Sequence, residues 1–255
     1  MRISLTDRCN LSCIYCMPKG NAFFLHNEDI LTFCEICDFA GYAVNQGIKK
    51  IRLTGGEPLV RKEIVEIVSF LSKLEGLEDL SMTTNGLLLE EYARKLAEAG
   101  LHRVNISLDT VNPEKFAQLT GGGNLGRVLA GIKAAQEAGF GIIKINCVVD
   151  KDEKEPDAVE VAEFARKNKL HVRFIPRMDM AKGTFYGVIG GNGGICSICN
   201  RLRLTCDGRI KPCLFSDISF GIRVLGMEEA LRRAVEEKPE AGKISTKCHF
   251  YNIGG

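Results

Sequence analysis

Three cysteines lie close together near the start of the chain, in the stretch LTDRCNLSCIYCMPKG (residues 5–20). Cys9, Cys13 and Cys16 are separated by three and then two residues, and Tyr15 precedes the last of them. A structural zinc site needs four ligands, and this stretch offers no fourth cysteine or histidine. Three thiolates instead suit a [4Fe–4S] cluster in which one iron stays open for a small molecule.

A second cysteine group lies in the stretch CSICNRLRLTCDGRIKPC (residues 196–213). Cys196, Cys199 and Cys213 again provide three well-spaced thiolates. Cys206 lies between them, so a zinc ribbon with four cysteines must also be considered. The spacing alone leaves both kinds of metal site open.

The composition is that of an ordinary globular protein, with 45% hydrophobic and 26% charged residues in a chain of 255. A net charge of +2 predicts no nucleic-acid partner, and no apolar run reaches the about 18 residues that suggest a membrane span. Residues 1–6 (MRISLT) are typical of a strand and not of a signal peptide. We therefore expect a cytoplasmic protein, whose eleven cysteines are metal ligands, catalytic groups or small buried residues and not disulfides.

Strands and helices alternate through the first two thirds of the chain. Short runs rich in Ile, Val and Leu predict strands over 2–6, 50–54, 79–84, 103–108, 143–149 and 171–176, apolar enough for a sheet covered by helices. Apolar residues at helical spacing predict helices over 32–47, 62–74, 88–99, 124–139 and 157–168. Thr32 and Glu35 form a capping box at the start of the first helix, and Gly47 ends it.

This alternation predicts an α/β fold with a parallel sheet and right-handed crossovers. Periodicity alone leaves a doubly wound sheet and an incomplete barrel open. After residue 177 the alternation stops, and a glycine-rich, loop-like segment carries the second cysteine group. One more helix is predicted over 227–237. We therefore divide the chain into a first domain, residues 1–177, and a C-terminal segment, residues 178–255.

The first cysteine group resembles the cluster-binding motif of the radical S-adenosylmethionine (radical SAM) superfamily, which has the same spacing and the same aromatic position. TGGEP (54–58) follows the second strand, as the superfamily's Gly-Gly-Glu-Pro segment does, and TTNG (83–86) and NISLD (105–109) end the next two strands. The resemblance implies a partial (β/α)6 barrel with a C-terminal cluster-binding extension. It implies a [4Fe–4S] cluster on Cys9, Cys13 and Cys16, and S-adenosylmethionine contacts at Tyr15, Gly56, Ser107 and Met178.

The second cysteine group, read as CxxCxRxRLxxDG…PCLF, resembles the C-terminal cluster segment of MoaA-type GTP 3′,8-cyclases, the first enzymes of molybdopterin biosynthesis. The resemblance implies that Cys196, Cys199 and Cys213 hold a second [4Fe–4S] cluster, whose open iron meets the guanine of GTP. Gly254 and Gly255 match the family's C-terminal Gly-Gly tail, which reaches into the active site.

The activity implied by this resemblance is the cyclisation of GTP to 3′,8-cyclo-7,8-dihydro-GTP, a lyase reaction of molybdenum cofactor biosynthesis. A 5′-deoxyadenosyl radical removes hydrogen from the ribose C3′, and the substrate radical then attacks guanine C8. The implied partners are GTP as substrate and an electron donor such as flavodoxin or ferredoxin. A homodimer is a further expectation.

Basic residues on the predicted strands favour an anionic substrate. A triphosphate needs several cations, and arginine forms forked hydrogen bonds to phosphate oxygens. Lys50 and Arg52 point to the same face of their strand, and a cation inside an apolar strand is costly without an anion, whereas Lys49 is read as an ordinary solvated charge. The positions that match GTP contacts of the family are Arg2, Lys50, Arg52, Thr83, Lys144, Arg173, Arg201, Leu202 and Arg203.

The chain departs from the family in one connection. Residues 178–195 join the sixth strand to the second cysteine group, where the family has several dozen residues. The alternatives are therefore a two-cluster radical SAM paralogue that acts on a peptide or another small molecule, and a zinc-binding interaction module. Arg201, Arg203 and the Gly-Gly tail favour a nucleotide.

The remaining cysteines are expected to be structural. Cys34 and Cys37 form a CxxC inside a helical pattern, for which burial is preferred to ligation. Cys147 lies in a predicted strand and Cys206 is read as a small buried residue. No role is assigned to Cys248.

Overall fold

Six parallel strands form the centre of the fold, and all six lie where the sequence predicts strands. The computed structural model describes residues 1–17 and 24–246, and every structural statement below concerns these residues. The strands are hydrogen-bonded in the order β6-β5-β4-β3-β2-β1. Their bounds are β1 Arg2–Ser4, β2 Lys50–Thr54, β3 Asp79–Thr84, β4 Arg103–Ser107, β5 Ile143–Val149 and β6 His171–Pro176.

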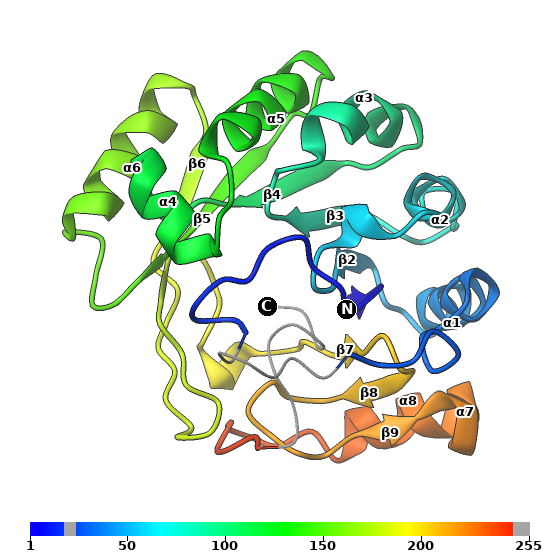
Figure 1. The fold of residues 1–255 in the computed structure, drawn as a ribbon. Helices are drawn as coiled ribbons and strands as arrows, with labels where there is room; N and C mark the ends of the chain where they lie inside the picture. Colours follow the sequence, from blue (N-terminus) through cyan, green and yellow to red (C-terminus); the bar gives the residue numbers. More distant parts are fainter. Residues whose placement is uncertain (18–23, 247–255) are drawn as a thin grey trace.

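Most of the helices lie along the outer side of this curved sheet (Figure 1). The capping box of the first helix is confirmed: the Thr32 side chain accepts from the Glu35 amide, and the Glu35 side chain accepts from the Thr32 amide. The bounds are α1 Phe33–Asn45, α2 Ile64–Leu71, α3 Leu89–Glu98, α4 Pro113–Thr120, α5 Leu125–Glu137 and α6 Pro156–Lys167.

The sheet has one apolar face and one polar face. Successive side chains of a strand point to opposite sides, so Ile3, Ile51 and Val104 are buried against the helices while their neighbours point inward. The expectation of a sheet covered by helices therefore holds for the outer face only. The inner face carries the polar strand residues, including Arg2, Ser4, Arg52, Thr54, Ser81, Thr83, Arg103, Asn105, Lys144 and Arg173.

The C-terminal segment continues the same sheet beyond β1. β7 (Arg203–Leu204) pairs with β1 in parallel, and β8 (Arg209–Lys211) and β9 (Phe220–Gly221) follow antiparallel. The described part of the chain thus forms an open sheet of nine strands. Two helices follow, α7 (Ile222–Leu225) and α8 (Met227–Glu236). The predicted partial barrel and the last helix are confirmed, but the prediction of a loop-like segment missed these strands, which are too short to show a period.

One hydrophobic core joins the two parts of the chain. Leu204, Ile210 and Leu231 from the C-terminal segment belong to the same buried cluster as Ile3 and Leu53. A second, small cluster forms around Met180 and Phe215, beside the second cysteine group. The division at residue 177 therefore stays a prediction, since the two parts share a sheet and a core. Among the described residues no helix is long and apolar enough to cross a membrane.

Candidate active site

The first cysteine group lies on the loop that leaves β1 at the carboxyl edge of the sheet. The dark blue loop crosses the open side of the sheet in Figure 1. The amides of Cys16 and Met17 both donate to the Cys13 carbonyl at 3.0 Å, which folds the end of the motif into a turn. The Cys9 thiol accepts from the Leu11 amide at 3.4 Å and from Asn85 Nδ2 at 3.8 Å. The loop therefore presents three partly buried thiols at the sheet edge.

The two glycines of TGGEP are required by the backbone of this same loop. A Cβ on Gly56 would lie 2.3 Å from the Arg8 carbonyl oxygen, and one on Gly55 would lie 2.7 Å from the Thr6 carbonyl oxygen. The Gly56 amide donates to the Thr6 carbonyl at 2.7 Å, and the Glu57 amide donates to the Arg8 carbonyl at 2.8 Å. The glycine pair thus docks the segment that leads into Cys9.

Glu57 joins the ends of two neighbouring strands. Its buried carboxylate accepts from Thr84 Oγ1 and from the Asn85 amide at 2.7 Å each, and from the Leu59 amide at 3.0 Å. Burial raises the pKa of Glu57 to about 7, although these hydrogen bonds oppose the shift. Glu57 therefore fixes Asn85, which in turn contacts Cys9.

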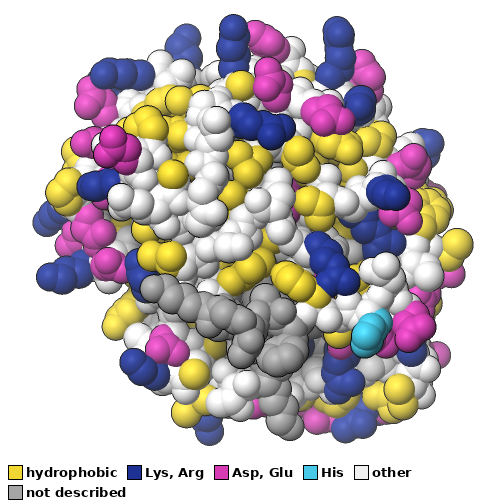
Figure 2. Space-filling view, in the orientation of Figure 1, with side chains coloured by type: hydrophobic (Ala, Val, Ile, Leu, Met, Phe, Trp, Pro, Cys, Tyr) yellow, Lys and Arg dark blue, Asp and Glu magenta, His cyan; other side chains and the backbone are white. Residues whose placement is uncertain are grey.

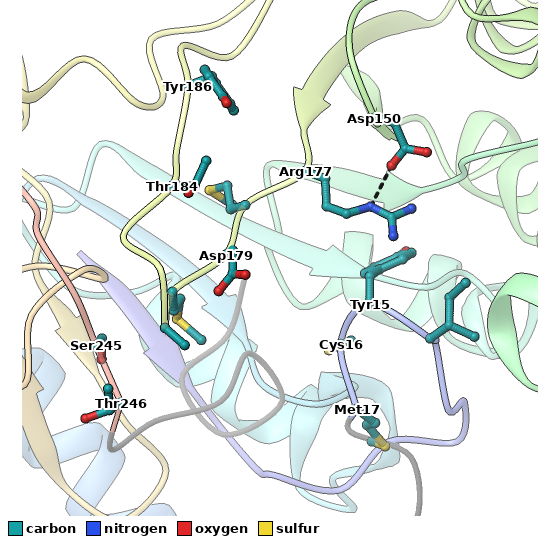
Figure 3. Close-up of a pocket in the computed structure, with 14 residues that line it drawn as sticks. Tyr15, Cys16, Met17, Asp150, Arg177, Asp179, Thr184, Tyr186, Ser245 and Thr246 are labelled. Atoms are coloured by element: carbon teal, nitrogen blue, oxygen red, sulfur yellow. Dashed lines mark ion pairs between the residues drawn. The ribbon is translucent and has the colours of Figure 1, made fainter.

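Asp109, the last residue of NISLD, holds the other end of the cysteine loop. Tyr15 Oη donates to Asp109 Oδ2 at 2.5 Å, and the Val148 amide donates to Asp109 Oδ1 at 2.8 Å. Burial raises the pKa of both Asp109 and Tyr15. Arg177 lies over the Tyr15 ring at 5.9 Å and pairs with Asp150 at 2.8 Å (Figure 3). Sequence reasoning had given Asp109 and Arg177 no role.

The chemistry of the three thiols fits an iron–sulfur cluster. Burial raises the pKa of Cys13 and of Cys16 to about 12, and the charges of neighbouring cysteines add to the shift. Three thiolates at this position therefore need a compensating cation, which the irons of a cluster provide. No three His, Cys, Asp or Glu side chains in the described part of the chain converge on a point that one metal ion could occupy.

A cavity of about 620 Å³ opens beside this loop (Figure 3). Tyr15 and Met178, two of the predicted S-adenosylmethionine contacts, line it together with Cys16 and Arg177. The other two predicted contacts do not line this cavity: Gly56 follows β2, and Ser107 ends β4. All four lie on segments at the carboxyl edge of the sheet.

The predicted substrate residues gather mainly on the polar inner face. Strand register places Arg203, Arg2 and Arg52 side by side, and Lys144 and Arg173 lie on the neighbouring strands β5 and β6. Thr83 lies on β3, and Arg201 precedes β7. Lys50 is exposed at the start of β2, and Leu202 is buried with its carbonyl accepting from the Arg2 amide at 2.9 Å. Lys49 is exposed and paired with Glu78, as expected.

These cations repel one another, and the Asp79 carboxylate offsets the charge of Arg52 and Lys144 only in part. Burial, and then the charge of Arg203, lowers the pKa of Arg2 well below its usual range, and burial lowers that of Arg52 and Arg203 to about 10. Burial and the neighbouring arginines also lower the pKa of Lys144 and of Arg173. Within residues 1–17 and 24–246, no ion pair involves Arg2, Arg52, Lys144 or Arg173. The positive charge on the inner face therefore favours the binding of a polyanion.

Among the buried polar atoms without a partner in the described residues, two lie on neighbouring strands of the inner face. Thr83 Oγ1 and Asn105 Oδ1 are buried and unbonded, and the two residues are register neighbours on β3 and β4. Asn105 Nδ2 donates to the Met82 carbonyl at 2.9 Å, which fixes the amide. A bound ligand would satisfy both atoms. Asn105 was missed from the sequence, although its inward position follows from strand alternation.

The second cysteine group lies at the opposite end of β1 from the first. Cys199 shortly precedes β7, and the start of β7 lies beside the start of β1 because these strands are parallel. Cys213 follows β8, which runs back antiparallel and therefore ends beside the start of β7. Cys196 begins a short 3-10 turn, Cys196–Ile198, and its carbonyl accepts from the Cys199 amide at 3.0 Å. The polar inner face thus lies between the two cysteine groups.

Positive charge lies beside Cys199 in the second group. The pKa of Cys199 is lowered, although its burial acts in the opposite direction. The lowering comes from hydrogen bonds with Arg201 and from the charges of Lys238 and Arg201. Lys238 Nζ donates to the Arg201 carbonyl at 2.9 Å and to the Pro212 carbonyl. Cys206 is fully buried in the core and burial raises its pKa to about 12, as expected for a structural cysteine.

The other cysteines are placed largely as predicted. Cys37 and Cys147 are buried. Cys34 is exposed, so its predicted burial is wrong: it lies on the solvent side of α1, whose buried face runs through Ile36, Cys37 and Ala40. Cys248 and the terminal pair Gly254–Gly255 lie outside the described residues.

Comparison with known proteins identifies clear relatives. Residues 3–165 match the radical SAM superfamily. The GTP 3′,8-cyclase of Peptoclostridium acidaminophilum is 39% identical over an alignment of 309 residues that covers 100% of this chain and 95% of the relative. The GTP 3′,8-cyclase of Moorella thermoacetica is 40% identical over 268 residues, covering 88% of this chain and 83% of the relative.

Solved structures show the same fold at low sequence identity. The anSMEcpe structure with bound AdoMet superposes with a TM-score of 0.67 at 18% identity and covers 99% of this chain and 86% of its own. SuiB of Streptococcus suis, bound to S-adenosylmethionine, gives a TM-score of 0.58 at 22% identity over 72% of this chain and 40% of its own.

Proposed function

The chain belongs to the GTP 3′,8-cyclase family of the radical SAM superfamily, and from this premise we propose that it cyclises GTP to 3′,8-cyclo-7,8-dihydro-GTP in molybdenum cofactor biosynthesis. One observation carries the proposal: a cation-rich, polar sheet face lies between two cysteine triads at opposite ends of the sheet. A nucleoside triphosphate carries the negative charge that such a face would bind.

Each cysteine triad would hold one [4Fe–4S] cluster. Cys9, Cys13 and Cys16 would bind the first, and Cys196, Cys199 and Cys213 the second. When bound, the first cluster and S-adenosylmethionine together supply a carbon radical that removes a hydrogen atom from the substrate. The residues of this chain contribute positioning, charge matching and exclusion of water.

The division of labour among the residues follows from their positions. Tyr15 and Met178 would line the S-adenosylmethionine site at the carboxyl edge of the sheet. Arg201 and Arg203, beside the second triad, would orient the guanine end of GTP. Arg52, Lys144 and Arg173 would neutralise the triphosphate, with Thr83 hydrogen-bonding the substrate. These sites leave the ribose facing the first triad.

The deciding experiment is anaerobic reconstitution with iron and sulfide, followed by incubation with GTP, S-adenosylmethionine and a reductant. Two clusters correspond to about eight irons per chain. Formation of a cyclised GTP product, together with 5′-deoxyadenosine, is the expected result. Two clusters and 5′-deoxyadenosine without consumption of GTP would contradict the proposal.

That negative result would favour a paralogue with another substrate, and one observation gives this alternative weight. The alignment with the Peptoclostridium acidaminophilum relative is longer than the 255-residue chain, so this chain lacks residues that the relative has. The short connection at residues 178–195 contributes Met178, Thr184 and Tyr186 to the cavity wall. A peptide or another small molecule is the substrate class to try next.

Several finer points belong to the same proposal. The electron would come from a donor such as flavodoxin or ferredoxin, and a cytoplasmic location and a homodimer are further expectations. On the face drawn in Figure 2, basic and acidic side chains are intermingled around the rim and form no large patch of one sign. This agrees with a small-molecule substrate bound on the inner face.

A further inference from the structure

Arg103 is an inward-facing arginine that the family motifs do not single out. Strand register pairs it with Ser81 on β3, and Ser81 pairs with Arg52 on β2. Arg103 therefore continues the row formed by Arg203, Arg2 and Arg52 across the sheet. Its side chain is largely buried, so it belongs to the inner face and not to the surface.

The guanidinium of Arg103 is only partly satisfied. Its Nη2 donates to Asp79 Oδ2 at the start of β3, but its Nε is buried and has no partner among the described residues. An arginine with one edge held by a carboxylate and another N–H unbonded is oriented to donate to a further acceptor. A buried unsatisfied donor is costly, so a ligand that accepts from it gains affinity.

The neighbours of Arg103 indicate what that acceptor is. Its charge contributes to lowering the pKa of Arg52, Lys144 and Arg173, so it lies within the cationic part of the inner face. Asp79 acts in the opposite sense on Arg52 and Lys144, as a carboxylate inside this group. Asp79 offsets only part of the positive charge of this group, so the remaining cations favour a ligand with several negative charges.

We infer that Arg103 binds the phosphate chain of the substrate and that Asp79 both orients Arg103 and sets how much negative charge the site requires. This inference rests on the proposed function for the identity of the nucleotide. Chemically it needs only a polyphosphate. Asp79 is a positioning residue, and Arg103 is a binding residue.

The test compares Arg103→Gln and Asp79→Asn in the reconstituted protein. Binding of GTP, GDP, guanosine and inorganic tripolyphosphate is measured anaerobically by calorimetry. Arg103→Gln is expected to weaken GTP and tripolyphosphate binding by about tenfold to a hundredfold, with a smaller loss for GDP and no change for guanosine. Asp79→Asn keeps an acceptor for Arg103 but removes the charge, and is expected to tighten GTP binding by about threefold to tenfold.

The opposite signs separate this role from a structural one. If the pair only stabilises the sheet, both substitutions weaken every ligand, guanosine included, and the inference is overturned. Equal GTP binding by Arg103→Gln and the unmodified protein also overturns it. Arg103→Lys, which keeps the charge, tests the site if the glutamine variant does not fold, and is expected to bind tripolyphosphate more tightly than the glutamine variant.

Controls distinguish this inference from the proposed function. Arg94→Gln removes an exposed cation of α3, paired with Glu98 at 3.6 Å, and is expected to leave all four affinities unchanged. If the unmodified protein binds tripolyphosphate but not GTP, the proposed nucleotide is wrong, and the Arg103 site is still judged by tripolyphosphate. If Arg103→Gln binds tripolyphosphate as tightly as the unmodified protein, the inference is wrong whatever the nucleotide.

Discussion

At the scale of single residues, Glu57 shows how a site residue can cost stability. Its carboxylate accepts three hydrogen bonds, yet burial raises its pKa from 4.5 to about 7. The folded state therefore holds the proton more tightly than the unfolded state. The stabilising contribution is complete below about pH 4.5 and is lost as the pH rises to about 7.

We expect the free energy of unfolding to fall between about pH 4.5 and about pH 7 because of Glu57, by about 3 kcal/mol at most. Glu57→Gln removes the titration, so its stability should vary less over this range. Urea unfolding of both proteins at several pH values measures the difference. Parallel pH profiles for the two proteins would show that Glu57 is not the titrating group.

The inward-facing residues also show the limit of motif reading. Arg52 and Thr83 could be named because they match family positions, whereas Asn105 and Arg103 lie in the same rows of the sheet without such a match. Alternation along β4 predicts that both point inward. It does not predict that Asn105 Oδ1 and Arg103 Nε are left without partners, because that depends on the facing strands.

At the scale of elements, the docking of TGGEP on the cysteine loop gives a steric prediction. Gly56→Ala would place a methyl group 2.3 Å from the Arg8 carbonyl, so the loop or the strand end must move. We expect a loss of about 3 kcal/mol in stability and reduced iron at the first site. Iron content after reconstitution and thermal unfolding measure both effects.

Gly141→Ala is the matched control, because a Cβ there meets nothing within 4 Å. It should retain the iron content and unfolding temperature of the unmodified protein. Normal iron binding by Gly56→Ala would show that the close approach is not needed to present the thiols.

The end of α8 gives a second prediction at this scale. Lys238 donates hydrogen bonds to the carbonyls of Arg201 and Pro212. Arg201 lies two residues after Cys199, and Pro212 directly precedes Cys213. Lys238→Met keeps the length of the side chain but removes both hydrogen bonds and the charge near Cys199. We expect weaker binding or a lower reduction potential of the second cluster, measured by iron content and redox titration followed by EPR.

Lys243→Met, at an exposed position of the same segment, is the control and should leave both properties unchanged. If Lys238→Met keeps the reduction potential and the full iron content, Lys238 serves only to hold the backbone at Arg201 and Pro212.

The sequence predicts helices and strands correctly where an apolar pattern extends over five or more residues. The strands β2, β3, β5 and β6 have the predicted bounds, because each is a run of five or more residues between turn signals. Helix α4 was missed because only Phe116 and Thr120 are buried on it, which leaves no apolar stripe. Strands β7 to β9 have two or three residues each, and their pairing partners are set by distant parts of the chain.

At the scale of the whole molecule, the two cysteine groups occupy opposite ends of the sheet and should act independently in cluster binding. Cys196→Ala is expected to lower the iron content from about eight to about four per chain. The variant should still cleave S-adenosylmethionine to 5′-deoxyadenosine, because the first group and its loop are untouched. It should form no cyclised GTP.

Iron analysis and chromatography of the two products check this prediction. Turnover of GTP by Cys196→Ala would show that the second cysteine group does not serve the reaction. Loss of all iron would show instead that the two ends of the sheet are coupled during assembly.

The position of β1 between β2 and β7 has a consequence for synthesis. Arg2 pairs with Arg52 on one side and with Arg203 on the other. One edge of β1 therefore stays unpaired until β7 has been translated, about 150 residues after β2. Such long-range pairing slows folding, and an unpaired strand edge is prone to aggregate. The nascent chain can therefore bury its first six strands early, while β1 stays open on one side until β7, Arg203–Leu204, has been made.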